Sequence, residues 1–197
     1  MWNSFPAPFH RLFCKTAVTV THHRGVQMIR RVAFRKAIMA GAAGALAWEV
    51  VLRVLISLGL PLFDLVFTLG TMVLGQVGFW LWWPAGMALH ATVGAIWAIF
   101  YAYFFWSTFD WSPTVQGLVF SLGPAVLAGL IMVPQMGFMH ALMLSGTLRP
   151  PGVFAANLGW GGPGGILLGH LIYGIAMGSM YVKPVGYRVG RRILPYG

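Results

Sequence analysis

Two stretches of the chain carry the same spacing of residues that could do chemistry. They read His90-x3-Gly94-x3-Ala98-x2-Tyr101 and His170-x3-Gly174-x3-Gly178-x2-Tyr181. On a helix, positions i, i+4, i+8 and i+11 fall within about 80° of one another, so each stretch forms one stripe on a helix face. We call these the two histidine stripes.

The histidine stripes admit three interpretations. His90 and His170 could ligate one metal ion or haem from facing helices. They could hydrogen-bond across the helix interface or to a loop carbonyl. They could also accompany close helix packing, which small residues spaced as in Gly165-x3-Gly169 and Gly174-x3-Gly178 favour.

Glu49 and Arg53 form a second candidate site, because both fall inside a long apolar run. At a spacing of four residues they lie on the same helix face, about 6 Å apart along the axis. Each charge costs about 2.5–3.5 kcal/mol to insert, so the pair must neutralise itself and face protein or water. The pair is interpreted as an ion or proton site, or as a buried ion pair that fixes helix register.

Methionines suggest a third, copper-binding possibility. Four of them recur at i, i+4, i+7 and i+11, next to His140: Met132, Met136, Met139 and Met143. Thioether ligands together with a histidine suit Cu(I). However, Pro134 interrupts this stretch, and methionine is also a common packing residue. His90, His170, His140 and Met136 are therefore the weak metal candidates, and no cofactor is the main expectation.

The composition places the chain in a membrane. Of its 197 residues, 58% are hydrophobic and 8% are charged, against about 25% charged in soluble domains. The chain has thirteen Lys and Arg residues but only three acidic ones. Most of the basic residues lie in a basic N-terminal segment (1–36) and a basic tail (183–197). This distribution predicts two ends held at an anionic membrane surface, and not a nucleic-acid partner.

Hydropathy and length predict an all-α, polytopic fold with four transmembrane helices inside a membrane domain (37–182). The expected spans are 37–60, 86–106, 115–133 and 166–182. Segment 62–83 is expected to be re-entrant or interfacial, and a short apolar segment (135–145) follows the third span. Four spans leave both basic ends in the cytoplasm, whereas five would send the basic tail outward.

The two halves of the domain predict a tandem repeat. Repeat 1 covers about 37–106 and repeat 2 about 115–182, and each contributes two crossings, a proline and a histidine stripe. Two-crossing copies share one orientation, so an axis normal to the membrane relates them. The halves are expected to meet along the stripes, with Gly94, Gly165, Gly169, Gly174 and Gly178 as helix-packing positions.

Several short motifs resemble a known group. They are the Gly-rich first span, Gly59-Leu60-Pro61-Leu62-Phe63-Asp64, His90-x3-Gly94, Pro134-x2-Gly137 and Gly169-His170-x2-Tyr173-Gly174. Together they are similar to the YagU-type domain-of-unknown-function proteins of bacterial inner membranes. The resemblance covers about residues 35–182 and implies a four-span bundle in a bacterial inner membrane. It implies no activity.

These observations favour a non-enzymatic function. The chain shows no HExxH, CxxC or paired-carboxylate motif, and its three acids limit acid–base chemistry. A structural or accessory subunit that packs against a membrane-protein partner, or against its own copies, is the main expectation. The alternatives are a small transporter or channel centred on Glu49 and Arg53, and a haem- or metal-binding bundle that uses His90 and His170.

Overall fold

The computed structural model describes residues 32–106, 108–109 and 111–181, and this part of the chain is helical without any strand. Most of the predicted basic N-terminal segment, the whole basic tail and Asp110 lie outside the described residues. The all-α prediction is confirmed for the described part.

Four helical stretches are long and apolar enough to cross a membrane. The first is α1 (Phe34–Ser57) and the last is α7 (Gly161–Met180). The second is α3 (Phe79–Phe100), which ends in the π-helical turn η2 (Tyr101–Phe105). The third joins α4 (Pro113–Leu127), the π-helical turn η3 (Ala128–Met132) and α5 (Val133–Met139). Four spans are therefore present, as predicted.

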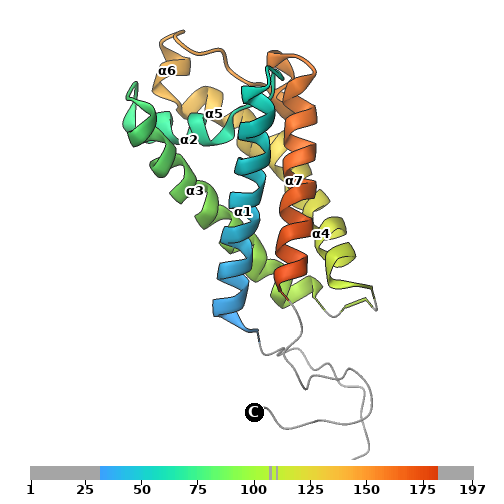
Figure 1. Cartoon of the computed structure of the whole chain (residues 1–197). Coiled ribbons are helices and arrows are strands. Elements are labelled where there is room, and N and C mark those ends of the chain that lie inside the picture. The colour runs from blue at the N-terminus through green and yellow to red at the C-terminus, as the bar shows by residue number, and fades with distance from the viewer. Residues whose placement is uncertain (1–31, 107, 110, 182–197) are drawn as a thin grey trace, which may run out of the picture. The chain divides into compact units, whose positions relative to one another are not determined.

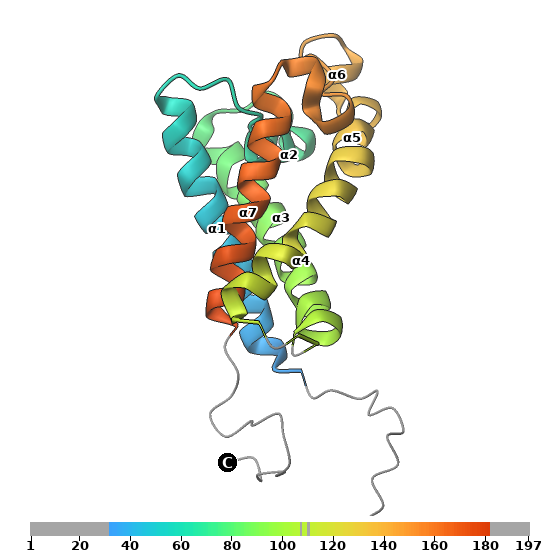
Figure 2. The ribbon, with the colours of Figure 1, turned by 90° about the vertical axis from the view of Figure 1, so that its right-hand side faces the viewer.

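The first span begins and the last span ends at the same end of this bundle (Figures 1 and 2). There the backbone N–H of Ala33 donates a hydrogen bond to the Tyr181 hydroxyl at 3.3 Å. The short elements lie at the opposite end (Figure 1): α2 (Leu65–Leu74), α6 (Ala141–Leu144) and the 3₁₀ turn η4 (Val153–Leu158).

Two prolines lie inside spans, whereas the sequence predicts Pro84 just before the second span and Pro134 just after the third. The second span begins at Phe79 and not at residue 86, so Pro84 and the tryptophans before it belong to α3. Proline fixes φ near the helical value and costs one backbone hydrogen bond, which a long apolar helix tolerates. The expected re-entrant segment (62–83) is thus shorter, with α2 as its one helix.

Pro134 lies inside the third span for a related reason. In the π-helical turn η3 just before it, a backbone N–H donates to the carbonyl five residues back. Such turns accommodate local departures from regular α-helical hydrogen bonding. The span consequently continues to Met139, six residues beyond the predicted end at 133. The last span also starts earlier than predicted, at Gly161 instead of 166.

The spans pack as two pairs that share a seam. Helix α1 packs against α3, α4 packs against α7, and α7 also packs against α1. In the second pair, backbone atoms of Gly174 and Gly178 on α7 contact Gly117 on α4. In the first pair, Gly94 and its neighbours on α3 contact Gly41 on α1 in the same way. Glycine lets the backbones approach closely where no side chain would fit.

We expect Gly117→Ala to lower the midpoint of thermal unfolding in detergent. Its added methyl group would meet the backbone of Gly174 and Gly178, and overpacking of this kind costs about 1–3 kcal/mol. Gly123→Ala is the matched control on the same helix, because nothing lies within 4 Å of the added Cβ. There the higher helix propensity of alanine should leave the midpoint unchanged or raise it. Equal midpoints for the two variants would contradict this packing.

Candidate functional site

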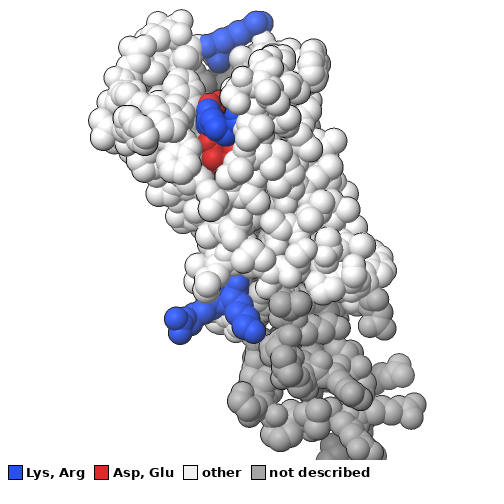
Figure 3. Space-filling model, in the orientation of Figure 1, with Lys and Arg blue, Asp and Glu red and all other residues white. Residues whose placement is uncertain are grey.

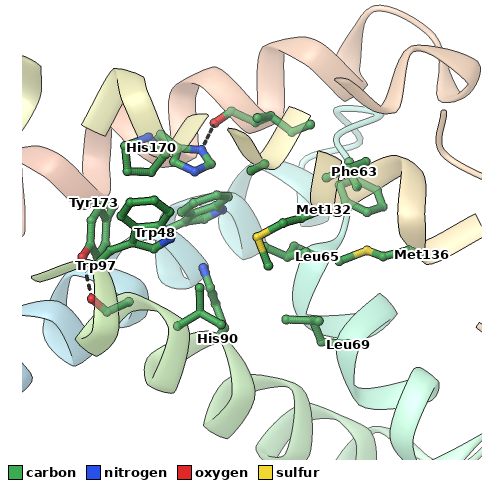
Figure 4. Close-up of a pocket in the computed structure, with 16 residues that line it drawn as sticks. Trp48, Phe63, Leu65, Leu69, His90, Trp97, Met132, Met136, His170 and Tyr173 are labelled. Atoms are coloured by element: carbon green, nitrogen blue, oxygen red, sulfur yellow. Dashed lines mark hydrogen bonds between the residues drawn. The ribbon is translucent and has the colours of Figure 1, made fainter. Parts of the chain in front are cut away.

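The two histidine stripes face each other inside the bundle, with α1 contributing one residue between them. The indole of Trp48 lies between the two imidazoles, with ring centroids 4.7 Å from His90 and 4.6 Å from His170 (Figure 4). Gly169 leaves the space that this indole occupies. We call this arrangement the Trp48 site.

The tyrosines of the stripes also meet. The rings of Tyr101 and Tyr181 contact edge to face with centroids 6.0 Å apart, near the end where both chain ends of the bundle lie. Between this pair and the histidines, the Tyr173 hydroxyl donates to the Gly94 carbonyl at 2.6 Å (Figure 4). The stripes thus form one layered interface of tyrosines, glycines and histidines.

The two histidines differ in their hydrogen bonds. Nδ1 of His170 lies 2.8 Å from the Ile166 carbonyl, which only accepts, so we assign the proton to Nδ1 and a lone pair to Nε2. His90 is 5% exposed, and its Nδ1 has no partner within the described residues.

A cavity of about 80 Å³ adjoins the Trp48 site. Its walls are aromatic and aliphatic apart from the two imidazoles, and they come from every long span (Figure 4). The residues that line the cavity include Trp48, Phe63, Leu69, His90, Val93, Trp97, Ala128, Met132, Met136, His170 and Tyr173. Apolar cavities with a few convergent polar groups are the usual form of small-molecule sites.

The geometry does not favour a metal or haem held by both histidines. The Trp48 indole stands between the imidazoles, so a shared ligand set would require that ring to move. Among the described residues, no three His, Cys, Asp or Glu side chains are grouped so that they could hold a metal ion.

The methionine stripe is not continuous. Met136 and Met143 are buried in an apolar cluster, whereas Met132 and Met139 are exposed. The intervening His140 has both nitrogens engaged: Nδ1 accepts from the Leu142 N–H, and Nε2 lies 3.0 Å from the Thr71 hydroxyl. This buried histidine links α6 to α2, a contact between distant segments that the sequence does not signal.

Glu49 and Arg53 meet as predicted, and two further residues join them. Arg53 bonds Glu49 Oε1 at 2.6 Å and 3.0 Å, and it bonds the Asp64 carboxylate at 2.7 Å and 2.9 Å. Trp83 donates its indole N–H to Glu49 at 3.0 Å. We call these four residues the charge cluster.

Asp64 has a second role, because its carboxylate also accepts from the Phe67 N–H and caps α2. Sequence reasoning missed Asp64 as a partner of Arg53. The sequence does signal the cap itself, because an aspartate directly before an apolar run is typical of a helix N-cap. Trp83 lies 34 residues from Glu49, and no local pattern announces that contact.

The charge cluster lies in a hollow near the end of the bundle that carries α2 (Figure 3). On the face shown, the surface between this hollow and the basic residues at the other end carries no charged side chain. The Arg53 side chain is 30% exposed and that of Glu49 only 5%. The Trp48 cavity is lined by Trp48 and not by Glu49, so the two sites are separate.

This arrangement favours a tether over a transport site. The Glu49 carboxylate is already occupied by Arg53 and Trp83, and Arg53 joins α1 to the start of α2. A transporter centred on Glu49 needs a cavity that reaches this carboxylate, and Glu49 is not among the residues that line the Trp48 cavity.

Comparison with family models, with curated proteins and with solved structures finds no match to this chain. The resemblance to YagU-type proteins stays a prediction.

We expect Arg53→Leu to lower the thermal unfolding midpoint, with a loss of about 3 kcal/mol, because two carboxylates are left without their counter-charge. Arg53→Lys should fall in between, since an ammonium keeps the charge without the two-pronged geometry. Arg149→Leu removes the same charge from an exposed loop position and serves as the control. If it destabilises the protein as much as Arg53→Leu does, the tether is refuted.

Proposed function

We propose that the chain is a non-enzymatic accessory or structural protein of a membrane, which packs against a partner's spans or against its own copies. The observation that carries this proposal is the closure of the charge cluster. Glu49, Arg53 and Asp64 are bonded to one another and join α1 to the start of α2, so these three charges hold helices together.

The sides of the spans support this proposal. In the most apolar stretch of each span, between 28% and 44% of the residues are buried inside the bundle. The remaining residues are half-buried or exposed, and large apolar side chains such as Met39, Val54, Phe104 and Leu130 are among the exposed ones. Such surfaces suit lipid and the spans of another membrane protein alike, and an accessory subunit requires the second.

This proposal is tested by extracting the full chain with its surrounding lipid into polymer nanodiscs and weighing single particles. We expect particles heavier than one chain plus lipid, containing either further copies or a second membrane protein identified by mass spectrometry. Extraction with a harsh detergent should return the single chain and serves as the mass reference. A uniform population of single chains in the nanodiscs would argue against an accessory role.

We further propose a bacterial inner membrane, with both ends in the cytoplasm and with two tandem repeats. Support comes from the shared end at which α1 begins and α7 ends, where Arg35 and Lys36 are exposed. Basic residues next to spans favour the cytoplasmic side. The matching glycine contacts of Gly41 with Gly94 and of Gly117 with Gly174 support the repeat.

Reporter fusions at the two ends test this orientation. A fluorescent reporter that folds only in the cytoplasm should be active at either end, and alkaline phosphatase, which needs the periplasm, should be inactive at both. Alkaline phosphatase fused in the loop after Leu144 should be active, because four spans place that loop outside. Opposite readings at the two ends would disprove the four-span orientation.

A further inference from the structure

Each imidazole of the Trp48 site has a ring nitrogen without a hydrogen-bond partner within the described part of the chain. His90 is 5% exposed, and its Nδ1 has no partner there. His170 donates its one proton to the Ile166 carbonyl, which leaves its Nε2 as an acceptor. Buried polar groups are nearly always hydrogen-bonded, so this open acceptor on a residue that lines the cavity indicates a donor group that binds there.

The cavity borders the lipid-facing surface between two spans. Val93 and Trp97 on α3 line it, together with Ala128 and Met132 on η3. These spans pack mainly against other helices: α3 against α1 and α2, and α4 against α7. Met132 lines the cavity and is also 41% exposed, so it stands at the boundary between the cavity and the hydrocarbon.

We propose that this cavity binds a lipid-soluble molecule through a hydroxyl group, with access from the bilayer between α3 and η3. A hydroxyl carries a proton, so it can donate a hydrogen bond to the lone pair of His170 Nε2. A carbonyl only accepts and would leave His170 Nε2 unpaired. The chemistry therefore selects an alcohol over a ketone or an ester.

The size and walls of the cavity narrow the ligand further. A volume of about 80 Å³ compares with about 30 Å³ for one water in the liquid, so it holds a hydroxyl and a few carbons. A straight hydrocarbon chain can continue outward past Met132, whereas a bulky ring system exceeds the space. The apolar walls at Phe63 and Leu69 suit the carbons of an alcohol better than they suit water.

The test uses the full chain in lipid nanodiscs and a photoreactive hexadecan-1-ol that carries a diazirine near the hydroxyl. We expect cross-links on cavity residues such as Val93, Trp97 and Met132, mapped by peptide mass spectrometry. Excess hexadecan-1-ol should reduce this labelling about fivefold, and the same excess of hexadecyl methyl ether, which has no O–H, should not. Equal competition by the ether, or labelling spread over lipid-facing residues only, would overturn the proposal.

Two variants and a control locate the binding. Ala128→Phe fills the cavity from η3, and His170→Phe removes the accepting imidazole at similar volume; each should reduce specific labelling about fivefold. Leu130→Phe adds a ring on the same turn at a position that is 52% exposed, and labelling should match the parent chain. If His170→Phe does not fold, Ala128→Phe still decides. Labelling that is the same in Ala128→Phe and Leu130→Phe refutes the site.

Discussion

One guanidinium between two carboxylates organises one end of the bundle. In an apolar surrounding, the charge on Glu49 needs a counter-charge, and Arg53 supplies it one turn away on the same helix. Arg53 has more donors than Glu49 can use, so it also binds Asp64 and lies 5.5 Å from the Trp82 ring. The turn after α1 must therefore fold back far enough to bring Asp64 to Arg53.

That constraint determines where α2 lies and what it covers. Asp64 caps α2, so the residue that binds Arg53 is also the residue that starts the helix. Helix α2 then packs along α3, and its Leu65 and Leu69 form part of the wall of the Trp48 cavity. The hydrogen bond between Thr71 and His140 ties the far end of α2 to the segment after α5. The charge cluster thus positions α2, and α2 supplies part of the cavity wall, although the two sites share no residue.

The sequence was sufficient for features that depend on composition and local spacing. Four apolar spans, the Glu49–Arg53 contact and the single-face stripes all follow from periodicities of one or two turns. Two span boundaries near prolines were predicted wrongly. The second span begins before Pro84 and includes it, and the third span continues through a π-helical turn and past Pro134. Contacts of Glu49 with Trp83 and of Thr71 with His140 join segments 34 and 69 residues apart, and no local pattern encodes them.

The position of Trp48 could not be predicted either, and it decides what the histidine stripes do. A repeat with matching stripes suggests two imidazoles in equivalent surroundings. In the structure, however, an indole from α1 lies between them. Pro124 on α4 and Ala128 on η3 also line the cavity, and both have small side chains. The indole therefore adjoins a space that the surrounding side chains leave unfilled. At about 24 cal/mol per Å³, a space of this size costs about 2 kcal/mol relative to a filled core, so a molecule that fits it would stabilise the fold as it binds.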